Sequence, residues 1–92
     1  EVVLNGKSIV DLKLYPNPVR RKMNIEFFAA SLDQIQINIT GLNGTLVQQI
    51  IHEPQDIGTQ ELKIDVSQLS VGSYFVVVDN GAYKDQKQFV KK

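Results

Sequence analysis

Apolar and polar residues alternate in several short runs of this 92-residue chain. In the run 34–40, isoleucines at every second position alternate with polar residues. The run 58–66 also alternates, with Leu62, Ile64 and Val66 on one side. A side-chain period of two is typical of a β-strand with one buried face, and no stretch shows the 3.6-residue period of a helix. The alternation therefore restricts the chain to an all-β fold.

The strand-like runs recur at intervals of about 8–12 residues, which predicts an immunoglobulin-like antiparallel β-sandwich of about seven strands. The runs are 10–15, 23–28, 34–40, 45–52, 58–66, 72–78 and 84–91. In the first run, Val10, Leu12 and Leu14 are expected to share the buried face. The run 72–78 is apolar on both sides and is expected in the middle of a sheet, whereas the polar last run is expected at an edge.

Two features of the strands and turns carry further expectations. The run 45–52 contains the adjacent apolar pairs 46–47 and 50–51, which either a bulge or burial on both faces would explain. The dipeptide Asn80-Gly81 predicts a hairpin with a type I′ turn, and 41–44 predicts a second hairpin loop. The prolines of 16–18 end the first strand and predict a stiff extended corner.

Composition limits the domain organisation and the class of partner. Ten basic and ten acidic residues cancel, so no overall charge favours nucleic acid. The chain is long enough for one domain, expected over 10–92, with 1–9 as a linker or a short first strand. Because the sequence begins with Glu1 and not with methionine, it is expected to be a piece of a larger protein.

The residues that could perform catalysis are few. His52 is the only histidine, no cysteine is present, and no serine lies in the Gly-x-Ser-x-Gly context of a nucleophile. The carboxylates are scattered and have no metal-binding spacing. The sequence therefore predicts no enzyme, no metal site and no cofactor.

Four segments in series resemble the C-terminal sorting domains of type IX secretion cargo in Bacteroidetes. Tyr15, Pro16, Asn17 and Pro18 are similar to the Tyr-Pro-Asn-Pro signature with which that family opens. The segments 37–39 with 44–47, 65–76 and 87–92 resemble its central hairpin, its next block and its basic and apolar end, whereas 40–42 replace a more usual aromatic or aspartate stretch. The turn at 20–22 departs from the family, since it is basic where acidic or polar residues are common.

The resemblance implies a secretion signal that directs a fused N-terminal cargo domain through the outer membrane. The cargo would fold in the periplasm, pass the outer-membrane translocon and end at the cell surface or outside the cell. In many family members a sortase-like protease cuts before the domain and attaches the cargo to lipopolysaccharide. Weak self-association through edge strands is a further expectation for such a sandwich.

The recognition surface is expected around the last strand. The residues expected to form it are Gly72, Tyr74, Lys84, Lys87, Phe89, Val90, Lys91 and Lys92. Protection of an edge strand against unwanted pairing would equally explain the lysines.

An alternative function is a fibronectin-like or carbohydrate-binding accessory module of a multidomain surface protein. It would need an exposed aromatic platform, for which Tyr15, Phe28 and Tyr83 are the available side chains.

Overall fold

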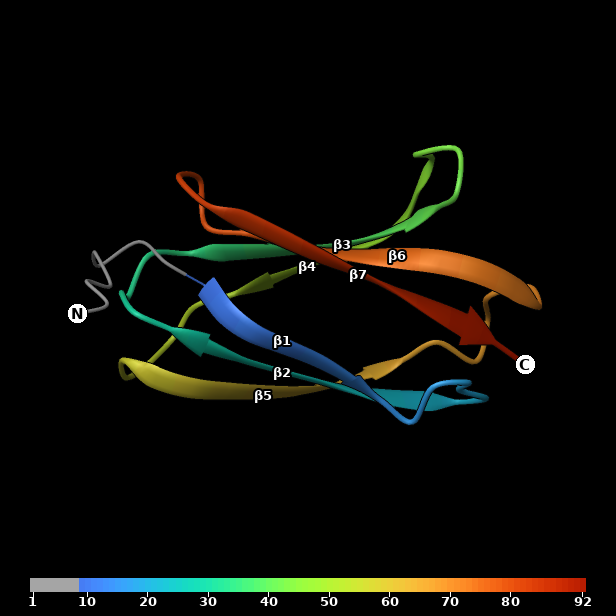
Figure 1. The fold of residues 1–92 in the computed structure, drawn as a ribbon, viewed down its shortest axis with the longest axis horizontal. Helices are drawn as coiled ribbons and strands as arrows, with labels where there is room; N and C mark the ends of the chain where they lie inside the picture. The colour runs from blue at the N-terminus through green and yellow to red at the C-terminus, as the bar shows by residue number, and fades with distance from the viewer. Residues whose placement is uncertain (1–8) are drawn as a thin grey trace.

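A computed structural model describes residues 9–92 of the chain as seven β-strands in two antiparallel sheets packed face to face (Figure 1). The strands are β1 (Ile9–Tyr15), β2 (Lys22–Ala29), β3 (Ile35–Gly41), β4 (Leu46–His52), β5 (Gly58–Asp65), β6 (Gly72–Asp79) and β7 (Lys84–Lys91). The predicted seven-stranded sandwich is confirmed. Within residues 9–92, no helix is long and apolar enough to cross a membrane. Of the segment 1–9, only Ile9 lies within the described residues, and it begins β1.

One sheet has the strand order β1-β2-β5 and the other the order β4-β3-β6-β7. This three-plus-four division is an immunoglobulin-like arrangement. The apolar strand β6 lies inside its sheet between β3 and β7, and the polar strand β7 lies at the edge, as the sequence predicts. Strands β1 and β7 form neighbouring edges of the two sheets (Figure 1).

The core lies between the sheets and is built from the alternating apolar residues. Ile35, Ile37 and Ile39 of β3 are at most 1% exposed, and Met23 and Phe27 of β2 are equally buried. Each such side chain stabilises the fold by about 1.5–3 kcal/mol relative to exposure. The period-two pattern therefore predicts the buried face of the interior strands correctly.

Strand β1 departs from strict alternation. Its pairing with β2 shifts register between Val10 and Lys13, and Asp11 within the shift has a φ of 58°. Ile9 and Leu12, three positions apart, are both buried. Leu12 is buried and Leu14 packs partly buried against the core, as the alternation predicts, while a β-bulge inserts an extra residue between Ile9 and Leu12.

Strand β4 also contains a bulge. Ile39 pairs with Gln48 and Thr40 pairs with Leu46, so Val47 has no partner on β3. Leu46, Val47 and Ile51 are 51%, 44% and 47% exposed. Of the two explanations for the adjacent apolar pairs, the bulge is confirmed and burial on both faces is wrong.

The two predicted hairpins are present, but one has a different turn. The loop 41–44 joins β3 to β4, with Gly44 at a φ of 88°. In the loop 80–83, Gly81 has a positive φ and Asn80 does not, so the predicted type I′ turn is wrong. The Asn80 side chain instead accepts hydrogen bonds from the backbone N–H groups of Ala82 and Tyr83, which supports a four-residue loop.

Candidate recognition site

The corner after β1 lies against the outer edge of β7, although the two segments are far apart in the sequence. The prolines of 16–18 keep this corner out of a regular sheet, since each removes one backbone donor. Its path places residues 17–19 beside the C-terminal half of β7 (Figure 1). The structure thus brings together the first and last segments that the sequence singled out.

The side chain of Asn17 pairs with β7 in the manner of a peptide group. Its Oδ1 accepts a hydrogen bond from the N–H of Val90 at 3.0 Å, and its Nδ2 donates to the carbonyl of Gln88 at 3.3 Å. A carboxamide carries one acceptor and one donor side by side, as the backbone amide does. Asn17 therefore satisfies two edge groups that a neighbouring strand would otherwise pair.

Val19 continues this pairing with main-chain hydrogen bonds. Its N–H donates to the carbonyl of Val90 at 2.9 Å, and its carbonyl accepts from the N–H of Lys92 at 2.8 Å. The Val19 side chain is 1% exposed and belongs to the core. Two residues of the corner thereby hold the last residues of β7 in place.

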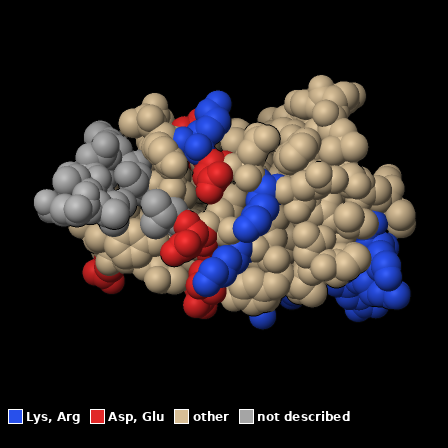
Figure 2. All heavy atoms as spheres, viewed as in Figure 1, with Lys and Arg blue, Asp and Glu red and all other residues tan. Residues whose placement is uncertain are grey.

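The same contacts bring the basic turn to the end of the last strand. Arg20, Arg21, Lys22 and Lys92 line one shallow surface hollow, together with Asp65 and Ser67. We call the four cationic residues the basic end. Figure 2 shows Lys and Arg gathered there, where β7 ends, while the acidic residues of this view lie elsewhere.

Asp65 is the acidic group in the hollow. The hydrogen bonds from the Ser67 hydroxyl and backbone N–H, the latter at 2.9 Å, lower the pKa of this carboxyl. The positive charges of Lys22 and Arg21 lower its pKa further. Asp65 is therefore held in its charged form and offsets only part of the positive charge of the basic end.

The expected recognition residues of β6 and β7 are neighbours across the sheet. Gly72 pairs with Lys91, and Tyr74 pairs with Phe89, their rings stacking at 5.5 Å between centroids. The Tyr74 hydroxyl donates to the carbonyl of Ser70 at 2.6 Å. Phe89 is fully buried, so its side chain fixes β7 to the core and presents no surface.

The four expected lysines do not form one cluster. Lys84 begins β7 and Lys91 ends it, about 23 Å apart at the rise of a β-strand. Lys87 points toward β1, where its Nζ donates to the carbonyl of Leu12 at 2.9 Å. Lys91 is 6% exposed and Lys92 lies in the basic end. Val90 is exposed beside Lys92.

The aromatic side chains considered for carbohydrate binding are not brought together. Tyr15 lies on β1 next to the corner, and its hydroxyl donates to Glu26 Oε1 at 3.1 Å, which raises the pKa of the tyrosine. Tyr83 lies in the loop before β7, and Phe28 is only partly exposed on β2. The three side chains therefore form no common platform.

Arg20 and Arg21 are not among the residues expected from the sequence to form the recognition surface, because a solvated turn is the simpler interpretation of 20–22. Both sit in the basic end beside Lys92. The run of three cations directly after the proline corner was the available signal. Its position relative to β7 depends on the long-range pairing of Asn17 and Val19, which no local pattern encodes.

Three comparisons relate the chain to known proteins. The sequence model of the family described as secretion system C-terminal sorting domain matches residues 13–92. No curated protein sequence matches the chain. Among solved structures, the crystal structure of dimeric latent PorU from Porphyromonas gingivalis is similar, with a TM-score of 0.69 and 21% sequence identity. The similarity covers 97% of this chain but 10% of the PorU chain, and at this identity it supports the fold alone.

Proposed function

Since this chain belongs to the family of secretion system C-terminal sorting domains, we propose that the type IX secretion machinery reads the end of the sandwich where β7 finishes. The family consists of type IX sorting signals and not of catalysts. Such a domain is fused to a cargo protein and marks it for export to the cell surface or for secretion.

The observation that carries the proposal is the pairing of the corner with the last strand. Asn17 and Val19 hold β7 by hydrogen bonds to Gln88, Val90 and Lys92. Both partners in this contact belong to motifs that resemble those of the family. A partner that contacted this end would therefore read both motifs at once, and it would do so only on a folded domain.

We place the direct contacts at exposed groups, namely Val90, Lys92 and the basic turn. Rim charges of this kind steer a partner of opposite charge and exclude the wrong ones. Gly72, Tyr74, Phe89 and Lys91 act behind this surface by fixing the end of β7. Lys87 reaches toward β1 and Lys84 lies at the other end of the strand, so both belong to edge protection.

We propose the partners at the level of the family. The outer-membrane translocon binds the basic end after the cargo has folded in the periplasm. A sortase-like protease then acts on the segment that precedes the domain. Any bond cleavage belongs to that protease, and this chain supplies the recognised surface.

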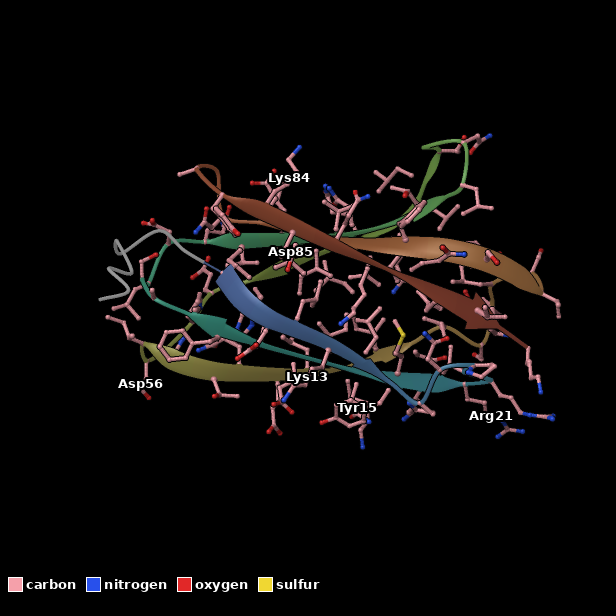
Figure 3. The ribbon with its side chains drawn as sticks, viewed as in Figure 1. Lys13, Tyr15, Arg21, Asp56, Lys84 and Asp85 are labelled. Carbon is pink, nitrogen blue, oxygen red and sulfur yellow. The ribbon has the colours of Figure 1, made fainter. Side chains whose placement is uncertain are left out.

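Export of a reporter fused to this chain tests the proposal in a Bacteroidetes strain with an active type IX system. The test variant reverses two charges of the basic end, Arg21→Glu with Lys92→Glu. The control variant, Lys13→Glu with Lys84→Glu, makes the same change of net charge away from that end. Figure 3 shows Lys84 and Arg21 far apart on the molecule.

We expect the basic-end variant to be exported severalfold less than the unmodified fusion, while the control is exported normally. All four substituted side chains are exposed, so we expect the sandwich to stay intact. Thermal unfolding of both variants verifies this. Equal losses in both variants, or normal export of both, would contradict the proposal. Binding of the chain to a glycan array would instead favour the accessory-module function.

A further inference from the structure

The two sheets have four edge strands, β1 and β5 in one and β4 and β7 in the other. An edge strand exposes unpaired backbone groups, and proteins protect such edges with charged residues, proline, bulges or a covering segment. Three of the four edges have such devices.

The corner covers the C-terminal half of β7 through Asn17 and Val19. Strand β1 carries a bulge in its middle and receives the Lys87 ammonium at the Leu12 carbonyl. The edge strand β5 presents alternating exposed charges to solvent. These are Glu61, Lys63 and Asp65. Pairing of a further strand at any of these edges would displace a hydrogen bond or bury a charge.

Within residues 9–92, strand β4 has none of these devices along its central part. Its sequence, Leu46–His52, contains no proline, lysine, arginine or carboxylate. Its bulge lies near its start, so 48–52 remain regular. Leu46, Val47 and Ile51 are about half exposed, and Figure 1 shows the β3–β4 hairpin curving away from the sandwich. Uncharged segments of this composition pair readily with another strand.

The backbone of β4 has a defined direction at the open edge. The N–H of Gly41 donates to the carbonyl of Thr45, which orients the backbone groups of alternate β3 residues toward β4. Residues 48, 50 and 52 of β4 face those groups in the antiparallel ladder. The N–H and C=O of Gln49 and Ile51 therefore point to the open edge.

We propose that β4 pairs antiparallel with β4 of a second copy of this chain. In every copy the edges at β1, β5 and β7 are covered or charged. Strand β4 is therefore the edge of the described sandwich through which two copies can pair. The chain has no net charge, and β4 carries no charge that would oppose pairing with itself. Two four-stranded sheets would then continue into one sheet across a twofold axis.

The pairing also defines its own register and size. Centring the contact on Gln49, whose backbone groups point to the open edge, pairs Gln48 with Ile50 of the second copy and leaves the bulge at Val47 outside the regular pairing. Because no uncharged edge remains among the described strands after this contact, we expect assembly to stop at two copies. A single strand pair buries much less than the ~800 Å² per partner of a stable interface, so we expect the association to be weak.

The absence of cysteine allows a direct test of the register. Residues of a hydrogen-bonded antiparallel pair have Cα atoms about 5.5 Å apart, within the range of a disulfide. We therefore expect Gln49→Cys to give a covalent dimer under mild oxidation. Lys63→Cys, an exposed position on the edge strand β5, is the matched control and should stay monomeric. Failure of Gln49→Cys to crosslink, or equal crosslinking of both variants, would overturn the proposal.

Sedimentation equilibrium of the unmodified chain provides the second measurement. We expect a monomer–dimer equilibrium that Ile51→Lys abolishes, since it places like charges at the pairing edge. Thr59→Lys makes the same charge change at an exposed position of β5 and should leave the equilibrium unchanged. A monomer at millimolar concentration, or association that Ile51→Lys leaves intact, would refute pairing through β4. The proposed dimer does not depend on the proposed export function, because crosslinking and sedimentation test it without any measurement of export.

Discussion

The side chain of Asn17 performs the role of a peptide group at the residue scale. It offers an acceptor to Val90 and a donor to Gln88, two backbone groups that flank one residue of β7. Aspartate has the same shape but lacks the donor, and glutamine has the same groups on a longer side chain. The requirement at this position is therefore both chemical and geometric.

We predict that Asn17→Asp lowers the free energy of unfolding by about 1 kcal/mol, the net value of one hydrogen bond. The carboxylate keeps the bond from Val90 but faces the Gln88 carbonyl with a second acceptor. Urea denaturation near neutral pH measures the change.

Asn43 provides the matched control. Its Oδ1 accepts a hydrogen bond from the N–H of Thr45 at 3.0 Å, a role that an aspartate can also fill. Asn43→Asp should therefore leave stability nearly unchanged. Equal effects of the two substitutions would show that the donor of Asn17 contributes nothing.

At the scale of the element, strand β7 is held in three ways. It pairs with β6 along its whole length, the corner covers its outer edge, and Phe89 inserts into the core. Removal of the last residues therefore removes a core side chain along with any recognition surface. A loss of export after such a truncation would not distinguish misfolding from lost recognition.

We predict very different effects of alanine at two adjacent residues of β7. Phe89→Ala should cost about 3–5 kcal/mol, because it leaves a cavity and removes the stacking with Tyr74. Val90→Ala, at a position 37% exposed, should cost less than about 1 kcal/mol. Chemical denaturation of both variants tests this. Similar costs would mean that β7 is anchored by its edge contacts and not by Phe89.

The elements differ in how well the sequence predicts them. Ile35, Ile37 and Ile39 indicate a buried face directly, because apolar residues recur in the sequence at the period of two with which side chains alternate between the faces of a strand. The bulge of β1 was not predictable from the sequence. Asp11 adopts a positive φ there, where glycine would usually signal such a conformation. The candidate site was predictable in its parts but not in its assembly. Asn17 and Val90 are 73 residues apart, and only the packed sandwich brings them together.

At the scale of the whole molecule, the two sheets contain interior strands and edge strands with different exposure of their backbone. Strands β2, β3 and β6 have a partner on each side. On β4, the backbone N–H and C=O groups of successive residues point alternately toward β3 and toward solvent. Local stability should therefore follow the sheet order and not the position along the chain.

We predict this order in hydrogen exchange. Amides of β3 and β6 should exchange slowest, and on β4 the amides of Gln48 and Ile50 should exchange much more slowly than those of Gln49 and Ile51. NMR-detected exchange in dilute solution measures the rates. Uniform rates along β4 would contradict the backbone orientation described for its open edge.

The contact between Asn17 and β7 also affects how the polypeptide matures. The groups that Asn17 and Val19 satisfy belong to Gln88, Val90 and Lys92, which a ribosome adds more than seventy positions after Asn17. A polypeptide that ends before Gln88 lacks those partners, so Asn17 and Val19 have no strand to pair with. The contact between the corner and β7 therefore forms only after β7 has been synthesised.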